Sequence, residues 1–562
     1  MPAFICRSRE DMSSITSTTN LTLARSRPLA NSSKRWLYVL WLVVIAGFAV
    51  LHALNLRADF PNHSPWLSDW AKYTDEGWYG SAAIRAHLFG NWYLPGDLNT
   101  AVAVPVWPFI EWILFFFTGV TVEAARGLAV AFLFTNLLLS YLLLRGRGPR
   151  WMALLALTFM VTSPFLYCFS RLAILEPLLT TLTLMALNLA VRLHRFRRPV
   201  LASAGIGLLF ALMLLTKTTA AFMLPALAWA LVLPLWNQRR IALRCTLAAT
   251  AAFALTFGFW LALIARAGLF RDFMYYFVVN KYAKPPQFYW PLVSFWWSFH
   301  GGLWVDHILV PLAGLVVVAA MAARWSSRVH KLLLDPVFGA SIGIIAGCIF
   351  FMTLQNHPQP RYFAVAAVFC FFVVAQGTGA LLAPADQGSG ANPLRPQSRL
   401  FGFAVLGLGI LAACINGYWT LNYSAHPEYT FVNAAQRLAH YMDQHPNGKR
   451  LLLSISGDQL TLLAHVPSVC DDYGTQELVA KLAAYQPGWY ATWNDIDPGA
   501  LEDLHNHYSL EQVASFRALD HPERNMLVLF KLHSLPPGQF RDPAVENLQV
   551  PLAGDQIGIP IE

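Results

Sequence analysis

Long apolar segments, repeated along most of the chain and separated by short basic loops, restrict what this sequence can fold into more than any other feature. Each has the roughly 17–25 residues that an α-helix needs to cross a bilayer. About eleven such segments lie between residues 36 and 420. Charged residues make up 13% of the chain, about half their usual share in soluble domains. The sequence therefore predicts a mainly α fold, a polytopic transmembrane helical bundle.

The basic loops indicate how this bundle is oriented. We predict that the spans begin near Trp36, Thr121, Arg150, Pro177, Val200, Thr218, Ile241, Gly302, Asp335, Tyr362 and Leu400. With the polar leader 1–35 disordered in the cytoplasm, the positive-inside rule is obeyed by all the basic loops, 145–150, 192–198, 237–244, 322–331 and 395–399. The formal net charge of +9 therefore indicates orientation rather than a nucleic-acid partner.

One apolar segment, "VPVWPFIEWILFFFTG" at 104–119, does not fit as a span. It is short, it contains two prolines and Glu111, and a crossing there would move every later basic loop outside. We predict an interfacial or re-entrant helix within one large external loop, 55–120. The tryptophans of this loop are expected to lie in the headgroup layer: Trp66, Trp70, Trp78, Trp92, Trp107 and Trp112.

The last part of the chain, 421–562, has the composition of a soluble domain. Helical periodicity marks 431–445, and short strands are predicted at 449–456, 466–472, 488–493 and 525–532. Cys470 is the only cysteine in this part, so the sequence predicts no disulfide framework and no CxxC metal site here. Because an odd number of predicted spans separates it from the cytoplasmic leader, this α/β domain is expected outside, together with the first loop.

Charged residues near the predicted external ends of spans are candidates for function, because ionisable groups at membrane depth are expensive. They occur in four short stretches, "TDEGWYGSAA" with Asp75 and Glu76, "SRLAILEP" with Arg171 and Glu176, "LLTKTTA" with Lys217, and "NHPQPRYF" with His357 and Arg361. Simpler roles exist for each: a helix N-cap for Asp75, an internal ion pair for Arg171 and Glu176, and interfacial anchors for Lys217 and Arg361.

Taken together, these residues suit transfer from a phosphate-bearing donor. A carboxylate can take a proton from an acceptor hydroxyl or amine. Cations can bind the donor phosphate and stabilise it as it leaves. A lipid tail on the donor would explain a site at the mouth of a helical bundle.

The order of these motifs resembles the GT-C glycosyltransferases, in particular the protein O-mannosyltransferase and aminoarabinose transferase relatives of the family 39/83 type. The resemblance covers about residues 36–420. It implies that Asp75 is the catalytic base and that Glu176 stands where Asp is usual. It also implies that the lipid phosphate is held by Lys217 and Arg361. We predict Glu76 and Glu176 as further catalytic residues, with Glu76 orienting its helix or its neighbours and Glu176 shaping the sugar and acceptor site together with Arg171.

The remaining site residues are expected around these groups. We place Arg171 with the donor-phosphate ligands, and Trp78, Tyr79, His357 and Tyr362 with the substrate-binding residues. The stretch "NTAVAVPVWPF" departs from the family pattern, because it lacks the Glu-Lys-Pro-Pro-like element of the aminoarabinose transferases and the His-Pro element of the mannosyltransferases. The resemblance therefore supports membership of the superfamily better than it supports any particular substrate.

The sequence thus predicts an inverting hexosyl- or pentosyltransferase of the cell envelope. Its donor is a polyprenyl-phosphate sugar, its acceptor is a lipid, glycan or protein, and no metal or other cofactor is required. We expect a bacterial inner membrane location, with the active site and the tail on the periplasmic side. A lipid-linked sugar flippase and a non-catalytic envelope assembly protein are the alternatives, although no inverted repeat of the kind found in transporters is visible.

Overall fold

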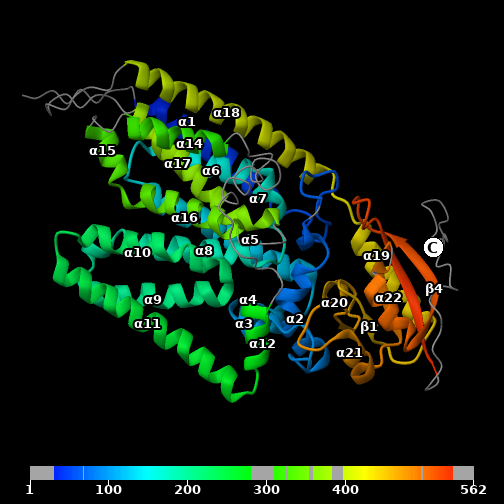
Figure 1. Cartoon of the computed structure of the whole chain (residues 1–562). Coiled ribbons are helices and arrows are strands. Elements are labelled where there is room, and N and C mark those ends of the chain that lie inside the picture. Colours follow the sequence, from blue (N-terminus) through cyan, green and yellow to red (C-terminus); the bar gives the residue numbers. More distant parts are fainter. Residues whose placement is uncertain are drawn as a thin grey trace, which may run out of the picture.

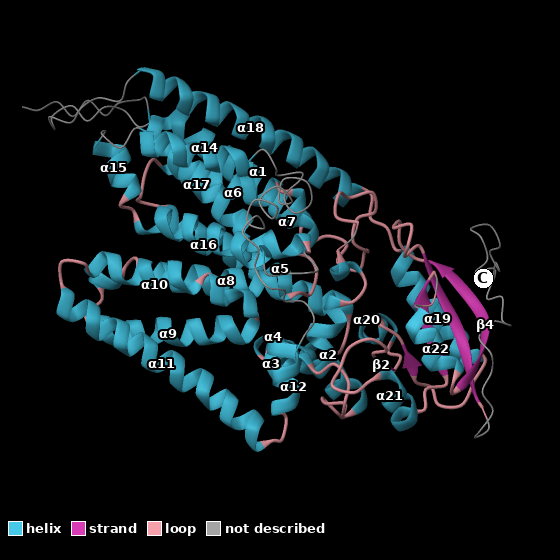
Figure 2. Cartoon of the chain, in the orientation of Figure 1, coloured by secondary structure: helices cyan, strands magenta, loops and turns pink. Residues whose placement is uncertain are grey.

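The structure, a computed structural model, describes residues 31–67, 69–279, 309–322, 327–353, 359–382, 396–494, 496 and 498–535. A bundle of long helices occupies one side of the molecule, and a smaller domain with a β-sheet occupies the other (Figures 1 and 2). The larger helices of the bundle are α1 (Asn31–Leu51), α5 (Val122–Leu144), α6 (Arg150–Thr162), α8 (Leu175–Ala190), α9 (Pro199–Thr216), α10 (Leu224–Val232), α11 (Arg239–Arg266), α14 (Leu309–Ala322), α16 (Pro336–Thr353), α17 (Ala364–Leu382) and α18 (Pro396–Ala425).

Each predicted span contains one of these helices. Within the described residues, six helices are long and apolar enough to cross a membrane: α5, α9, α11, α16, α17 with the preceding turn, and α18. The other five are shorter apolar helices. The protein is therefore a multi-pass membrane protein.

Short helices join the spans or lie beside them. They are α7 (Pro164–Phe169), η2 (Leu193–Arg195), η3 (Thr218–Phe222), η4 (Leu233–Leu235), α12 (Phe270–Met274), the π-helical turn η5 (Tyr275–Val279), α15 (Ser327–Leu333) and η7 (Pro360–Phe363).

The two ends of the bundle differ chemically. We call the end that contacts the smaller domain the domain end, and the other the basic end. Arg145, Arg192 and Lys331, from three of the predicted basic loops, line one hollow at the basic end. These three basic loops therefore share one end of the bundle, as the positive-inside pattern predicts for them.

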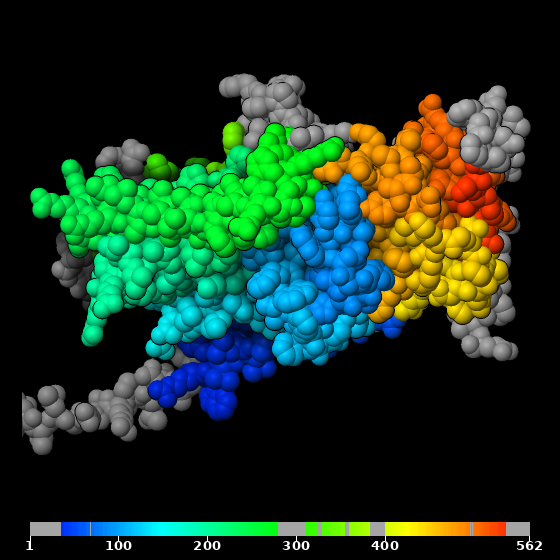
Figure 3. Space-filling model, turned by 90° about the horizontal axis from the view of Figure 1, so that it is seen from below, coloured from blue at the N-terminus to red at the C-terminus, as the bar shows by residue number. Residues whose placement is uncertain are grey.

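The first loop lies between the bundle and the smaller domain. It contains η1 (Trp70–Lys72), α2 (Asp75–Phe89), α3 (Thr100–Ala103) and α4 (Val106–Thr118). Figure 3 shows this loop in blue, between the green helices and the yellow to red domain.

The expectation that the tryptophans of this loop lie in the headgroup layer is wrong for part of the set. Trp66 and Trp107 are fully buried, and Trp78 is buried as well, whereas Trp92 and Trp112 are exposed. The reason is that the loop is sandwiched between two packed bodies and contributes to the main hydrophobic core.

The C-terminal domain is a five-stranded mixed sheet with helices. The sheet order is β2-β1-β3-β5-β4, in which β1 pairs in parallel with β2 and β3, and β5 pairs antiparallel with β3 and β4. The strands are β1 (Leu452–Leu453), β2 (Ser468–Val469), β3 (Trp489–Trp493), β4 (Tyr508–Arg517) and β5 (Met526–Ser534). The helices are α19 (Thr430–Gln444), α20 (Gly457–Ala464), α21 (Leu478–Tyr485) and α22 (Pro498–His505).

The helix and four strands that the sequence predicts in this domain are present. The longest strand, β4, was not predicted, because its residues "YSLEQVASFR" mix polar and apolar side chains and are mostly half-buried. A bulge between Gln512 and Ala514 further breaks its alternation. The last membrane helix continues to Ala425, a few residues past the predicted boundary at 421.

Close contact between α2 and α20 fixes the first loop to this domain. A Cβ atom on Gly77 would lie 2.1 Å from the main-chain nitrogen of Gln459, so only glycine permits this approach. The Gly77 N–H donates to Oε1 of Gln459 at 2.8 Å. Nearby, Arg85 forms buried ion pairs with Asp97 at 3.0 Å and with Asp458 at 2.6 Å. The domain therefore helps to position α2.

Candidate functional site

Asp75 is the first residue of α2, one position later than an N-cap. Thr74 occupies the cap position without a side-chain capping bond, so the N-cap alternative for Asp75 is wrong. The Thr74 hydroxyl lies 2.9 Å from the Trp70 carbonyl oxygen and 3.1 Å from Oδ1 of Asp75. The negative charge of Asp75 thus stands at the positive end of the helix dipole, and the side chain is completely buried.

Arg361 joins Asp75 to a second carboxylate, Asp69. Its guanidinium lies 2.6 Å from Oδ2 of Asp75 and donates to Oδ1 of Asp69 at 2.6 Å. The Arg361 main-chain N–H also donates to Oδ2 of Asp69 at 3.0 Å. Asp69 additionally accepts from the N–H of Ala71 and so caps η1. These contacts hold the start of α17 against the first loop.

A second buried pair lies beside the first. Lys217, in the turn between α9 and η3, forms an ion pair with Oε1 of Glu176 near the start of α8. The Lys217 ammonium lies 4.6 Å from the centre of the Tyr362 ring, and the Arg361 guanidinium lies 5.0 Å from it. Tyr362 is therefore the aromatic surface that both cations share.

The cluster holds three carboxylates, Asp69, Asp75 and Glu176, and two cations, Arg361 and Lys217. Its formal charge is negative when every group is ionised. Some hydrogen-bonding capacity is unused, because Nε of Arg361 and Oε2 of Glu176 have no hydrogen-bond partner within the described part of the chain. Lys217 has three donors, and its Nζ makes one hydrogen bond here, to Glu176.

A small cavity opens onto these groups. It is lined by Asp75, Lys217, Arg361, Gln359, Tyr276 and the predicted residues Trp78, Tyr79 and Tyr362. Its free volume is about 160 Å³, equal to roughly five water molecules at about 30 Å³ each. The cavity can therefore accept a compact polar group next to both the carboxylate and the cations.

Burial changes the acidity of Asp75. It raises the pKa of this carboxyl from its ordinary value to about 6, although the positive charge of Arg361 opposes the rise. Asp69 and Glu176 act in the same direction as burial, because they are like charges. Asp75 is therefore a stronger base than an ordinary aspartate and is still largely ionised at neutral pH.

The structure separates Glu76 from Asp75. Glu76 forms a two-pronged ion pair with Arg126 of α5 at 2.7 Å, and it accepts hydrogen bonds from Ala173 and Gln459. It does not line the cavity. Its contacts link α2 to the bundle and to the C-terminal domain, which fits the predicted orienting role.

Two other predicted site residues are not brought into the cluster. Arg171 donates to the carbonyl oxygens of Leu54 and Asn55, and its ring contact is with Tyr167. It therefore holds the turn that follows α1 and does not line this cavity, so it is not placed to hold a phosphate there. His357 lies outside the described residues.

Four residues belong to the site without having been predicted as site residues from the sequence: Asp69, Gln359, Tyr276 and Tyr473. Asp69 lies six residues before Asp75 within the same polar stretch, which is a usable signal. Tyr473 comes from the C-terminal domain, and its ring contacts Trp70 and Trp78 at centroid distances of 6.4 and 5.3 Å. No local pattern could have indicated that contact, because it depends on docking of the two domains.

A wider groove adjoins the cavity on the side of the C-terminal domain. Its free volume is about 910 Å³, and Trp70 lines both hollows. Aromatic rings and acids line it, including Tyr73, Asp471, Trp493 and Asp503. Oδ1 of Asp471 and the hydroxyl of Tyr73 are buried without a hydrogen-bond partner among the described residues. The groove thus offers unsatisfied polar groups beside a route to Asp75.

This architecture has the same fold as a solved membrane-protein structure, ArnT. ArnT from Cupriavidus metallidurans, solved with undecaprenyl phosphate, matches with a TM-score of 0.53 and 13% identity over 89% of this chain and 98% of that chain. Its apo form matches with a TM-score of 0.52 and 14% identity over the same shares.

More distant similarity extends to the oligosaccharyltransferase AglB from Archaeoglobus fulgidus, solved with an inhibitory peptide and a dolichol-phosphate. The TM-score is 0.47 and the identity 12%, over 85% of this chain and 73% of that chain. No family model and no curated protein sequence matches this chain. At these identities the two ArnT matches establish the fold and nothing further.

Proposed function

We propose that this protein is a membrane glycosyltransferase that transfers a sugar from a polyprenyl-phosphate donor to an acceptor on the external side. One observation carries the proposal: a single cavity is lined by a buried carboxylate with a raised pKa, Asp75, and by two cations, Lys217 and Arg361. The similarity of the fold to ArnT, which was solved with undecaprenyl phosphate, supports this class of donor.

The donor phosphate is held by Lys217 and Arg361. The unpartnered Nε–H of Arg361 and the two remaining ammonium protons of Lys217 are suited to phosphate oxygens. Since both cations are already paired with carboxylates, the phosphate must share them with these carboxylates. The affinity for the lipid phosphate after transfer is therefore expected to be modest. Such sharing favours release of the spent carrier.

Asp75 acts as the general base. It accepts the proton of the acceptor hydroxyl or amine while the acceptor oxygen or nitrogen forms a bond with the anomeric carbon. The bond between that carbon and the phosphate oxygen breaks, and the polyprenyl phosphate leaves with both electrons. A single displacement of this kind inverts the anomeric configuration. Lys217 and Arg361 stabilise the charge on the leaving phosphate, and for this reason we propose no requirement for a metal.

The acceptor reaches Asp75 through the groove beside the C-terminal domain. Support comes from the shared Trp70 and from the unpartnered polar atoms of Tyr73 and Asp471. A lining of aromatic rings and carboxylates suits a polyhydroxylated or cationic acceptor and repels an anionic one. This path places the reaction on the side of the C-terminal domain, the periplasm if the basic end is cytoplasmic.

Transfer in isolated membranes tests the proposal. The membranes contain the full chain and a polyprenyl-phosphate sugar with a labelled hexose or pentose, and the label is followed into lipid, glycan and protein fractions. We expect Asp75→Asn to slow transfer by about 10²–10⁴-fold while donor binding persists. Unchanged transfer by this variant would exclude Asp75 as the general base. If only deletion of the C-terminal domain lowers transfer, a non-catalytic assembly role is favoured.

The acceptor route has a separate test. Asp471→Asn should raise KM for the acceptor several-fold while KM for the donor stays constant, because the change lies in the groove and outside the cavity. Glu511→Gln serves as the matched control, because Glu511 is exposed on β4 and its carboxylate contacts His533 within the described residues. An equal effect of both variants would argue against the groove as the acceptor path.

A further inference from the structure

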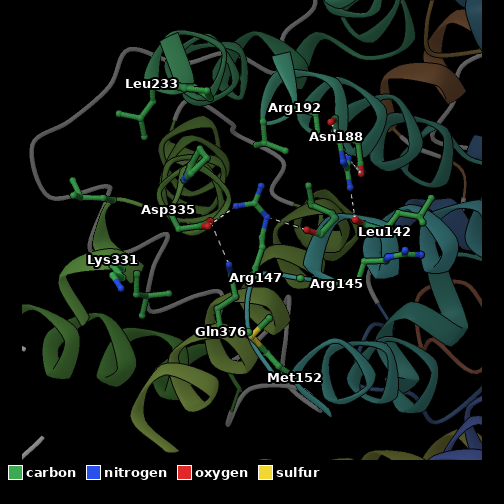
Figure 4. A pocket seen from close by; sticks show the side chains of 18 of the residues that line it. Leu142, Arg145, Arg147, Met152, Asn188, Arg192, Leu233, Lys331, Asp335 and Gln376 are labelled. Atoms are coloured by element: carbon green, nitrogen blue, oxygen red, sulfur yellow. Dashed lines mark hydrogen bonds and ion pairs between the residues drawn. The ribbon is translucent and has the colours of Figure 1, made fainter. Parts of the chain in front are cut away.

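A large hollow lies at the basic end of the bundle, far from the candidate site along the helices. Its free volume is about 1290 Å³, and it is formed by the ends of α5, α8 and α17, by the start of α16, and by α15 (Figure 4). Six basic side chains line it: Arg145, Arg147, Arg192, His194, Arg195 and Lys331. Asp335 is the single acidic residue in its lining among the described residues.

Two of these arginines build the wall. Arg147 pairs with Asp335 at the start of α16 and donates to the Leu143 carbonyl oxygen at 3.0 Å. Arg192 donates to the main-chain and side-chain oxygens of Asn188 and to the Leu142 carbonyl oxygen. Figure 4 shows both arginines held by these contacts. Specific ion-pair and hydrogen-bond contacts therefore hold the wall of the hollow in place.

The other cations lack an acidic partner. Arg145, Arg195 and Lys331 are exposed, and no ion pair to a carboxylate involves them within the described residues. Arg145 and Lys331 lie on opposite sides of the hollow in Figure 4. Burial lowers the pKa of Arg192, and the neighbouring Arg147, Arg195 and Arg145 lower it further. The hollow therefore has an uncompensated positive potential.

A buried polar group also faces this hollow. Gln376 of α17 is 3% exposed and belongs to the lining, with its Nε2 3.5 Å from Oδ1 of Asp335. Its Oε1 has no hydrogen-bond partner among the described residues. A buried amide oxygen without a partner is costly unless a ligand donates to it. Hydroxyl groups on a ligand would satisfy it.

Apolar side chains complete the lining. Leu142, Leu233 and Phe196 stand next to the arginines. A ligand that satisfies both parts of the wall has a phosphate, hydroxyl groups and a hydrocarbon part, and this combination is found in anionic phospholipids. Basic pockets between membrane helices bind such headgroups.

We propose that the hollow at the basic end binds the phosphate-bearing headgroup of an anionic phospholipid. Its hydroxyl faces Gln376, its phosphate faces Arg145, Arg195 and Lys331, and its acyl chains leave along the apolar wall. This site is separate from the candidate active site, and the proposal does not depend on glycosyl transfer. The simpler alternative is that these cations do no more than set the orientation of the protein in the membrane.

The experiment measures lipid retained by the purified full chain. Native mass spectrometry counts bound phosphatidylglycerol and cardiolipin, with phosphatidylcholine and inorganic phosphate as separate arms. The test variant is Arg145→Gln with Arg195→Gln and Lys331→Gln. The matched control is Arg239→Gln with Arg240→Gln and Arg244→Gln, which removes the same charge from exposed positions on α11 that do not line the hollow.

We expect the test variant to weaken retention of anionic lipid on the order of 100-fold, because each basic residue near an anionic group contributes about 1 kcal/mol. The control should change it less than about threefold. Equal losses in both variants would reduce the site to general charge attraction. The lipid assignment would be overturned if inorganic phosphate were retained as well as the anionic lipids are. It would also be overturned if the wild-type protein retained no anionic lipid.

A second measurement covers the case in which the test variant does not fold. A photoactivatable phosphatidylglycerol is crosslinked to the wild-type protein, and the labelled peptides are identified by mass spectrometry. We expect labels in 188–196 and 331–336, which line the hollow. Labels that occur only elsewhere on the chain would contradict the proposal.

Discussion

The two ends of the helical bundle use the same kinds of charged residue in opposite ways. At the domain end, Asp75, Arg361, Lys217 and Glu176 are buried and paired around a cavity of about 160 Å³. At the basic end, most cations are exposed around a hollow of about 1290 Å³, and one carboxylate, Asp335, lies among them in the described part of the lining.

The difference separates two tasks. Buried pairs in a medium of low dielectric constant are held in one geometry, and their pKa values shift, as chemistry requires. Exposed cations without partners keep a positive field that attracts anions and is weakened by salt. Charge alone would have marked both ends as functional, whereas burial and pairing distinguish a reactive site from a binding site.

The largest expected effect tests the domain end directly. We expect Asp75→Asn to lower kcat by about 10²–10⁴-fold, the usual contribution of a general base. Its thermal stability should stay equal or increase at pH 7, because the raised pKa means that the folded state holds the charged carboxylate less well than the unfolded state does. Steady-state transfer and thermal unfolding measure the two effects.

Asp443→Asn is the control for this variant. Asp443 lies on α19, is exposed, and pairs with the exposed Arg450 at 2.6 Å. Its replacement should change neither quantity by much, since exposed ion pairs contribute about 0–1 kcal/mol. A kcat for Asp75→Asn within about tenfold of the wild type would contradict general-base catalysis by this residue.

The next effect concerns the pair of Lys217 and Glu176. Lys217→Met leaves Glu176 buried without its cation, which should cost about 3–5 kcal/mol of the free energy of unfolding. The double variant Lys217→Met with Glu176→Gln should recover much of that loss. KM for the polyprenyl donor should rise about 10–100-fold in both variants, because a charge-assisted hydrogen bond contributes about 1.5–3 kcal/mol.

Denaturation and donor titration separate these outcomes. If the double variant regains both stability and donor affinity, the pair is structural and the phosphate is bound elsewhere. Recovery of stability without recovery of donor affinity assigns Lys217 to the donor.

A smaller effect tests whether the domain end depends on docking of the C-terminal domain. Gly77→Ala would place a Cβ atom 2.1 Å from the main chain of α20, so α2 and α20 must separate at a cost of about 1–3 kcal/mol. We expect lower thermal stability and a reduced kcat, since Asp75 lies two residues before Gly77 on α2.

Gly205→Ala is the matched control in the bundle. No atom lies within 4 Å of the added methyl group on α9, so helix propensity should increase stability by up to about 1 kcal/mol. Equal destabilisation by both substitutions would show that the contact of α2 with α20 has no special importance.

The smallest expected effect is a pH dependence of the domain end. Since the pKa of Asp75 is raised to about 6, kcat/KM should be constant above about pH 7 and fall about tenfold for each pH unit below the pKa. The value of kcat/KM falls toward acid pH because only the ionised carboxylate of Asp75 can accept a proton. Transfer rates between pH 4.5 and 8.5 measure it, and a profile that rises toward acid pH would exclude this role.

Much of the fold was predictable because hydropathy is a local property. The helices at all eleven predicted positions and the grouping of three basic loops at one end follow from segment length and loop charge. The strand β4 was not predictable in the same way, because it pairs with β5 on the edge of the sheet and most of its residues are half-buried or exposed. The burial of Trp66 and Trp107 also required the packed structure.

The sequence by itself determined which charged residues stand near the ends of membrane helices, and it included Asp75, Lys217, Glu176 and Arg361 among them. Only the tertiary structure decided how they pair. Asp75 pairs with Arg361, whereas the adjacent Glu76 pairs with Arg126. Arg171 donates to the carbonyl oxygens of Leu54 and Asn55, just after the first helix. The physical reason is that these partners are separated by tens to hundreds of residues, so helix packing, and no local pattern, sets the distances between them.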